Sequence, residues 1–219
     1  IAMIELKDVS FSFKKEPVLQ NINLTIADGA FIGVIGPNGA GKTTLIRLIL
    51  GILKPTSGKI ARTDKKISYV SQTTSLNDSS FPSSVEEVVA LGLASNKPFI
   101  FDFNSKKKRT EEVLKDVGIY DLRKKLVSEL SGGQLQKVKI AKALVSSPSL
   151  VVLDEPDAGM DEKSHEKLIE TINLLHEKKK ITVIFISHHM DDLTNADHIF
   201  LVENGKVTSV QEGEKYVSI

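Results

Sequence analysis

The chain has 219 residues, enough for one substantial domain with a well-buried core. Its 29 basic and 28 acidic residues nearly cancel, so we expect no nucleic-acid partner. It contains no cysteine, which excludes disulfides and thiol chemistry. No apolar run reaches the roughly 18 to 20 residues of a membrane span and no signal peptide opens the chain, so we expect a soluble protein that meets a membrane through a partner.

The first part of the chain alternates between apolar and polar residues. The alternation covers Ile4–Val9 and part of Val18–Ile26. This pattern predicts antiparallel strands rather than a strand–helix–strand unit. Phe11 and Phe13 lie between the two runs, and on sequence alone we expect both in the core, although an aromatic face can also stack on a base.

The most informative stretch is GPNGAGKTT, residues 36–44, between the apolar run Phe31–Ile35 and an apolar helical pattern. Glycines reach positive φ and let backbone N–H groups close around phosphate oxygens, and the following helix adds the positive end of its dipole. Lys42 can reach the β- and γ-phosphates, and the Thr43 hydroxyl can ligate Mg²⁺. The predicted triphosphate site consists of Gly36, Pro37, Asn38, Gly39, Ala40, Gly41, Lys42, Thr43 and Thr44.

A strand followed by a helical region comes next. The run Ile67–Ser71 predicts a strand that ends at Gln72. From Ser84 to about Leu144 the pattern is helical, and Ser84 with Glu87 can form a capping box. The basic run Lys106–Arg109 is interpreted as a solvated face, with binding to acidic lipid headgroups as the alternative.

The helical region contains a second helix start with room for an anion, LSGGQ, at residues 130–134. Ser131 is a natural N-cap, and Gly132 and Gly133 leave space beside the helix N-terminus. One triphosphate already fills the first loop, so this surface suits a nucleotide held by another subunit. An ordinary capped helix is the alternative interpretation.

Leu150–Leu153 is a continuous apolar run, as expected for a strand buried on both faces of a parallel sheet. It ends at Asp154 and Glu155, and two adjacent carboxylates at the tip of a buried strand are costly unless a cation or water chemistry uses them. Asp154 can hold Mg²⁺ through water, and Glu155 can orient and deprotonate an attacking water.

Helical spacing over residues 161–179 places His165 and His176 on a surface, where we assign them no special role. The strand Ile181–Ile186 then presents His188 on the ligand side of an open sheet, where it can donate a hydrogen bond to a γ-phosphate. A metal site is the competing interpretation, formed by His188, His189, Asp191, Asp192 and His198. We reject it because their spacing matches no recognised ligand pattern and the nucleotide already explains one histidine.

Taken in order, GPNGAGKTT, Gln72, LSGGQ, LVVLDEP and His188 resemble the nucleotide-binding subunit of an ABC transporter over essentially the whole chain. The resemblance implies an α/β fold, a P-loop NTPase core with a mostly parallel sheet. An N-terminal antiparallel β subdomain over about residues 3–30 and an inserted α-helical subdomain over about residues 73–145 would complete a single domain, 3–219. Ile1 and Ala2 precede the first plausible initiator, Met3, and are taken as non-native.

The resemblance also implies ATP and Mg²⁺ as cofactors and two copies facing head to tail, each ATP lying between one copy's phosphate loop and the other's signature. The signature residues acting in trans would be Ser131, Gly132, Gly133 and Gln134. The catalytic residues would be Glu155, His188, Gln72 and Lys42. The residues at Mg²⁺ would be Thr43, Gln72 and Asp154.

Phe13 falls where the family usually has a Tyr that stacks on adenine, and Val18 joins it in the ATP site. Stacking survives that replacement, whereas a hydroxyl contact does not. Asp157 and His189 also depart from the family, which commonly has a small hydroxyl residue and an Asp at these positions. The departures concern contacts in the dimer rather than the hydrolytic chemistry.

ATP hydrolysis would then drive an integral membrane permease through the Gln72 loop and the helical region. An extracytoplasmic substrate-binding protein would be an indirect partner, and the chain would lie on the cytoplasmic face of the cell membrane. Phe81–Val89 and Ala158–Asp161 resemble the ATPases of zinc and manganese importers. Another cargo is one alternative, and a non-transport ABC ATPase acting on nucleic acid is a second.

Spacing argues against the non-transport machines, since only about ninety residues and no heptad run separate the phosphate loop from LSGGQ. A small-molecule kinase with the same loop would have no use for LSGGQ.

Overall fold

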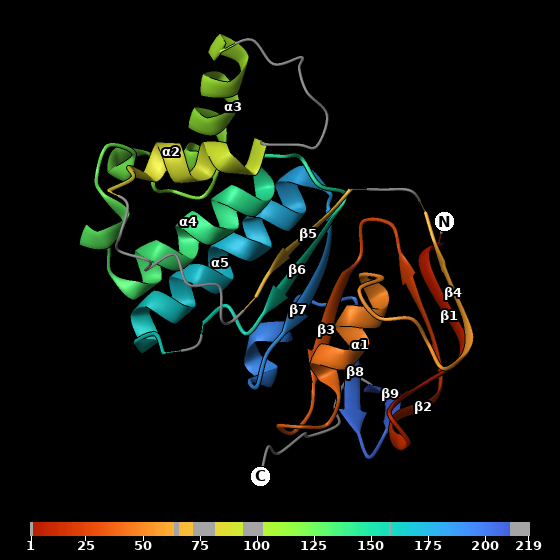
Figure 1. Cartoon of the computed structure of the whole chain (residues 1–219). Helices are drawn as coiled ribbons and strands as arrows, with labels where there is room; N and C mark the ends of the chain where they lie inside the picture. The colour runs from red at the N-terminus through yellow and green to blue at the C-terminus, as the bar shows by residue number, and fades with distance from the viewer. Residues whose placement is uncertain (1, 64–65, 72–81, 94–102, 158, 211–219) are drawn as a thin grey trace.

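The computed structural model describes residues 2–63, 66–71, 82–93, 103–157 and 159–210. Six strands form the central sheet in the order β5-β6-β7-β3-β8-β9 (Figure 1). They are β3 Phe31–Ile35, β5 Ile67–Val70, β6 Leu150–Asp154, β7 Thr182–Ile186, β8 His198–Glu203 and β9 Lys206–Val210. Neighbouring strands are parallel except in the antiparallel hairpin of β8 and β9. Every residue of β3, β6 and β7 is buried, as their continuous apolar runs predict.

A second, antiparallel sheet has the order β2-β1-β4. It consists of β1 Ala2–Phe13, β2 Glu16–Ala27 and β4 Ser57–Arg62. Leu6 of β1 lies opposite Leu24 on one side and Ile60 on the other, so the apolar face is continuous across all three strands. This sheet therefore combines the predicted N-terminal strands with one from beyond the phosphate loop.

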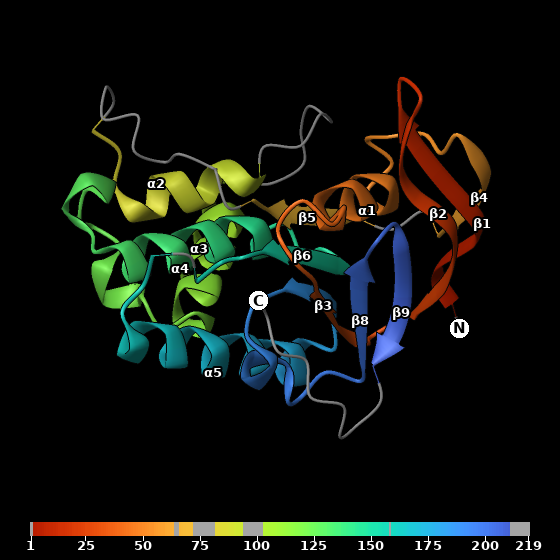
Figure 2. The ribbon, with the colours of Figure 1, turned by 90° about the horizontal axis from the view of Figure 1, so that it is seen from below.

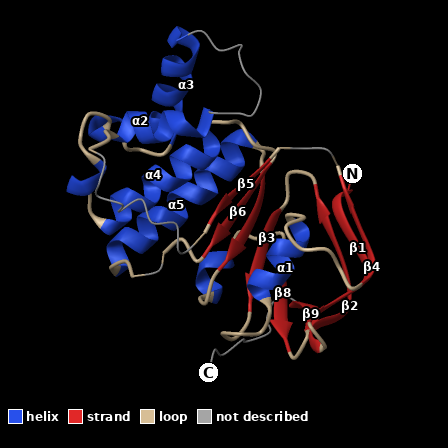
Figure 3. Cartoon of the chain, in the orientation of Figure 1, coloured by secondary structure: helices blue, strands red, loops and turns tan. Residues whose placement is uncertain are grey.

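Helix α1, Lys42–Ile49, lies among the strands, between the two sheets (Figure 3). Leu45, Ile46, Leu48 and Ile49 are each at most 2% exposed. They belong to one core cluster that also contains residues of β1 and β2 from the small sheet and of β3, β6 and β7 from the central sheet. The apolar character of the helix thus reflects burial on both sides.

The other helices gather at one side of the molecule (Figure 3). They are α2 Val85–Ala90, α3 Phe103–Asp116, α4 Gly132–Leu144 and α5 Glu162–Lys179, with short 3₁₀ turns at Leu91–Leu93, Tyr120–Leu122 and Val127–Glu129. A further 3₁₀ turn, Met190–Leu193, follows β7. Helix α4 lies between α2 and α5 (Figure 2). The predicted capping box is confirmed at the start of α2, where Ser84 N–H donates to Glu87 Oε2 over 2.8 Å and Glu87 N–H donates to Ser84 Oγ over 3.4 Å.

The four helices share a second core cluster with the other face of the central sheet. Along β6, Val151 and Leu153 face this cluster, while Leu150 and Val152 face the cluster of α1. The predicted α/β architecture, with a mostly parallel sheet, an antiparallel β part and a helical part, is confirmed. Among the described helices, none has both the length and the apolar character to cross a bilayer.

The two-sided core makes one side chain of α5 a sharp test of packing. Leu168 is 0% exposed and Leu174, on the same helix, is 65% exposed. We expect Leu168→Ala to lower the free energy of unfolding by about 2–5 kcal/mol, because it leaves a cavity in the cluster. Leu174→Ala, the matched control, should change it by less than about 0.5 kcal/mol. Urea unfolding measures both, and equal effects would contradict the assigned packing.

Candidate nucleotide site

The site lies at the carboxyl edge of three adjacent parallel strands, β6, β7 and β3. The phosphate loop follows β3, Glu155 follows β6, and Ser187 and His188 follow β7. Parallel strands end at the same edge of a sheet, so residues far apart in sequence meet there, as is usual for ligand sites in open α/β sheets. This topology brings three of the sequence-predicted motifs together.

The phosphate loop turns from β3 into α1 through glycines that other residues could not replace. A Cβ on Gly36, where φ is 149°, would lie 2.1 Å from the carbonyl oxygen of Val202 in β8. Gly41, the N-cap of α1, has φ of 103°. Both positions favour glycine strongly. The loop is therefore fixed to the sheet at its start and to the helix at its end.

Lys42 is the first residue of α1 and is only 7% exposed. Its Nζ donates to the carbonyl oxygens of Gly36, over 2.8 Å, and Pro37, over 3.2 Å. Burial lowers the pKa of Lys42, and the carboxylates of Glu155 and Asp154 act in the opposite direction. The ammonium group thus lies inside the loop and within electrostatic reach of both carboxylates.

Glu155 and His188 are in direct contact, with 2.7 Å between Glu155 Oε1 and His188 Nε2. Glu155 has φ of 47°, in the left-handed region that non-glycine residues rarely occupy. Such conformations concentrate at functional sites, where the surrounding structure compensates for their cost. Here the Glu155 N–H is bonded to the carbonyl oxygen of Ile186, at the end of β7.

Asp154 is 8% exposed and accepts a hydrogen bond from the Tyr69 hydroxyl over 2.7 Å. Burial and this hydrogen bond to Asp154 raise the pKa of Tyr69. Sequence reasoning did not single out Tyr69. Only the observed parallel pairing of β5 with β6 places Tyr69 opposite Val152, two residues before Asp154, and the sequence carries no signal for that pairing.

Phe13 contributes an exposed aromatic ring to the lining of the site. It is 48% exposed, whereas Phe11 is 7% exposed, and the two rings meet edge to face with centroids 4.8 Å apart. The expectation that both aromatics are in the core is right for Phe11 and wrong for Phe13, which is the last residue of β1. Phe13 and Val18 both line the cavity beside the phosphate loop.

That cavity has a volume of about 810 Å³. It joins the aromatic end of the site to the phosphate loop and to the Glu155–His188 pair. Its lining residues are Phe13, Val18, Asn38, Gly39, Gly41, Lys42, Thr43, Thr44, Glu155 and His188. Predicted residues from four separate parts of the chain therefore surround one space of a size suited to a small-molecule ligand.

Two further predicted elements are Gln72 and the signature at residues 131–134. Gln72 lies outside the described residues. Ser131 caps α4 as expected, since its Oγ accepts the N–H of Gln134 over 3.3 Å and its own N–H donates to Gln134 Oε1 over 3.1 Å. Among the described residues that line the cavity, none comes from Ser131–Gln134.

Two histidines of α5 differ from expectation. His165 lies between Asp157 and Asp192, and the Nδ1 of His176 contacts the carbonyl oxygen of Ile181 at 2.9 Å. Neither is a plain surface residue, because each contacts an element outside its helix. Within the described part of the chain, the acidic and histidine groups close enough to share a metal ion are Asp157, His165 and Asp192, which share only Asp192 with the metal set rejected above.

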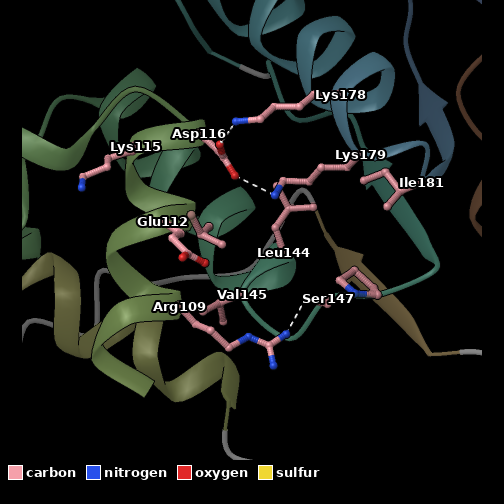
Figure 4. Close-up of a pocket in the computed structure, with 12 residues that line it drawn as sticks. Arg109, Glu112, Lys115, Asp116, Leu144, Val145, Ser147, Lys178, Lys179 and Ile181 are labelled. Atoms are coloured by element: carbon pink, nitrogen blue, oxygen red, sulfur yellow. Dashed lines mark hydrogen bonds and ion pairs between the residues drawn. The ribbon is translucent and has the colours of Figure 1, made fainter. Parts of the chain in front are cut away.

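A second cavity, of about 640 Å³, lies near the amino ends of β6 and β7 (Figure 4). Asp116 of α3 forms ion pairs there with Lys178 and Lys179 of α5, and Arg109 is bonded to Ser147. Burial opposes ionisation of Asp116, but the hydrogen bonds from the two lysines outweigh it and lower its pKa. These contacts tie α3 to α5 on the edge of the sheet opposite the phosphate loop.

One edge of the parallel sheet carries a glycine-rich loop with a buried lysine, two adjacent carboxylates and a histidine. These features define a phosphate-loop protein that binds nucleoside triphosphate. Residues 19–158 match the sequence family described as ABC transporter. A zinc uptake ATP-binding protein of Listeria monocytogenes, ZurA, is 39% identical over 86% of this chain and 77% of its own length. The high-affinity zinc uptake ATP-binding protein ZnuC of Bacillus subtilis is 36% identical over 93% of this chain and 92% of its own length.

Among solved structures, the dimeric structure of a bacterial ABC transporter cassette superposes with a TM-score of 0.81 at 28% identity, over 98% of this chain and all of that one. The chain belongs to the family of ABC transporter ATP-binding proteins, and it is an ATPase that powers an ABC transporter.

The exposed face of Phe13 predicts where the base of ATP binds. Removing the ring in Phe13→Ala should weaken ATP binding about 5- to 150-fold, because a base–aromatic stack contributes roughly 1–3 kcal/mol. Binding of inorganic tripolyphosphate, which lacks a base, should change less than about twofold. Phe13→Tyr is the matched control and should bind ATP like the parent. Titration calorimetry separates these cases, and equal losses for both ligands would contradict the assignment.

Proposed function

We propose that the chain hydrolyses Mg²⁺–ATP in a head-to-tail dimer and thereby drives import of a divalent metal such as zinc through a membrane permease. The observation that carries the hydrolytic part is the single cavity lined by Lys42, Thr43, Glu155 and His188. Phosphoryl transfer in such sites depends on positioning and charge neutralisation, for which these residue types suffice.

We assign each group in the cavity one step in binding or hydrolysing ATP. The loop N–H groups and Lys42 hold the phosphates, and Phe13 stacks on the base. Glu155 orients the attacking water and accepts its proton, while His188 donates a hydrogen bond to the γ-phosphate. The Glu155–His188 contact of 2.7 Å supports a shared task, since one group cannot move without affecting the other.

The residues present suit Mg²⁺. Asp154 and Thr43 offer oxygen atoms, the ligands that this hard cation prefers, and the buried Asp154 carboxylate is oriented by Tyr69. Gln72 is the third residue proposed at this ion. When bound, Mg²⁺ neutralises charge on the transferred phosphoryl group.

The signature is proposed to act on ATP held by a second copy. Ser131 and the N-terminus of α4 form an anion-compatible helix start, yet none of the described residues lining the nucleotide cavity comes from it. The related cassette was solved as a dimer, which supports the assembly of two copies here. An isolated copy should then bind ATP and hydrolyse it poorly.

Mixing two inactive variants tests the dimer. We expect Lys42→Ala and Ser131→Arg to be inactive alone, because each damages both sites of its own dimer. Mixed together, the heterodimer has one site with an intact loop and an intact signature, so hydrolysis should return to a sizeable fraction of the parent rate, on the order of a tenth or more. No recovery in a mixture shown to contain heterodimers would contradict assembly in trans.

The cargo is proposed from two zinc-uptake relatives and from the resemblance of Ala158–Asp161 to metal-importer ATPases. An ATPase subunit makes no contact with the cargo, so this step rests on analogy with the relatives. The permease and the extracytoplasmic binding protein belong to the same proposal, with the chain held at the cytoplasmic face of the membrane by the permease.

Transport assays test both parts of the proposal. Proteoliposomes containing the full transporter and its binding protein should take up radiolabelled zinc when ATP is present on the chain's side. Glu155→Gln should retain ATP binding and lower both hydrolysis and uptake at least about 100-fold. Uptake of another cargo in preference to zinc would contradict the metal assignment. Near-normal hydrolysis by Glu155→Gln would show that Glu155 is not the general base. Failure to copurify with any integral membrane partner would favour a non-transport ATPase.

A further inference from the structure

His165, on the first turn of α5, lies between two carboxylates from two other segments. Its Nδ1 is 3.1 Å from Asp157 Oδ2, in the segment after β6, and its Nε2 is 2.7 Å from Asp192 Oδ1, in the 3₁₀ turn after β7. The Nε2 contact is a hydrogen bond and the Nδ1 contact is at ion-pair distance, and with both carboxylates ionised each contact is favourable when its ring nitrogen carries a proton. The arrangement therefore favours an imidazolium cation.

The surroundings agree with a charged ring. Burial opposes protonation of His165, but Asp192 and Asp157 outweigh it and raise the pKa of the imidazole. The ring of His189 is 5.8 Å away and meets His165 edge to face. His165 lines a surface pocket to which all three segments contribute. The charged or titratable residues that line this pocket are Glu155, Asp157, Glu162, His165, His188, His189, Asp191 and Asp192.

Asp157, His165 and Asp192 each offer one ligand atom within 4.8 Å of the others, so a metal ion is the alternative to a proton at this cluster. The two nitrogens of one imidazole point away from each other, and each faces a different carboxylate. A bound ion needs its ligand atoms to converge on one point. In the arrangement seen here the imidazole places one nitrogen at each carboxylate, which is the geometry of a cationic bridge.

The contacts of His165 form a closed ring with the hydrolytic pair. Asp192 Oδ2 accepts the Ser187 hydroxyl over 2.5 Å, and Ser187 directly precedes His188. His188 contacts Glu155, and Asp157 follows Glu155 by two residues and returns the ring to His165. Moving either segment away from the other would break a charged contact at His165.

We infer that His165 is a positioning residue for ATP hydrolysis: as a cation between Asp157 and Asp192, it holds the segment carrying Glu155 and the segment carrying His188 in one arrangement. The inference rests on the proposed roles of Glu155 and His188. It gives the departure at Asp157 a purpose, because a small hydroxyl residue there would leave the cation with one partner.

The sign of the pH effect follows. The bridge exists while the His165 imidazole is protonated. Its contribution to holding the two segments together is therefore complete below the ordinary pKa of histidine, about 6.5, and is lost as pH rises through the raised pKa that His165 has in the folded protein. An arginine at position 165, which stays charged at these pH values, should keep this contribution.

Three variants of the full chain test the inference in steady-state ATP hydrolysis at several pH values. At pH 7, His165→Gln should lower kcat about tenfold while the ATP dissociation constant stays within about twofold, since the ring does not touch the nucleotide cavity. His165→Arg should keep at least about a third of parent kcat, and its activity relative to the parent should rise with pH. His198→Gln, an exposed histidine on β8, is the matched control and should resemble the parent.

A double-mutant cycle protects the test against simple misfolding. Asp157→Asn should lower kcat. The kcat of the double variant His165→Gln/Asp157→Asn should be little lower than that of the more impaired single variant, because both substitutions remove the same contact between residues 157 and 165. Additive losses, a parent-like kcat in His165→Gln, or equal impairment of His165→Gln and His165→Arg would overturn the inference. Glu155→Gln measured alongside reports separately on the base, so a failure of the proposed function is distinguishable.

Discussion

The structure depends on three buried strands, β6, β7 and β3, that lie side by side and run in the same direction. Their burial on both faces leaves no freedom of register, since a shift by one residue would exchange the two core clusters. The phosphate loop, the Asp154–Glu155 pair and His188 each follow one of these strands. Hydrophobic packing far from the nucleotide thus sets distances between polar groups that share no local sequence.

The same strands divide the molecule into two faces with different tasks. On one face, α1 is enclosed between the central sheet and the small antiparallel sheet, which brings Phe13 to the phosphate loop. On the other, α4 and α5 pack on the sheet and carry the signature and His165. Groups on the helical face reach the hydrolytic residues through the segments after β6 and β7, and so act on them indirectly.

Local pattern predicted the parts of the site that use short, specific motifs. The loop GPNGAGKTT and the apolar run before Asp154 gave correct elements, because glycine spacing and continuous burial leave strong signals in sequence. Alternation alone placed Phe13 in the core, because it does not tell where β1 leaves the core, whereas the family resemblance assigned Phe13 to the ATP site, and its exposed ring lines that cavity. His165 and Tyr69 were missed because their partners come from other segments, and helical or strand period says nothing about contacts across a parallel sheet. The role of Gln72 stays a prediction.

The close approach of Gly36 to the carbonyl oxygen of Val202 ties the phosphate loop to more than the strand that precedes it. Val202 belongs to β8, and the turn after it is bonded to β2 through the N–H of Gln20 and the carbonyl oxygen of Gly205, 2.7 Å apart. The hairpin therefore braces the phosphate loop against the sheet that carries Phe13. Phe13 and the phosphate loop line the same cavity, so the β8–β9 hairpin holds two walls of that cavity in a fixed relation to each other.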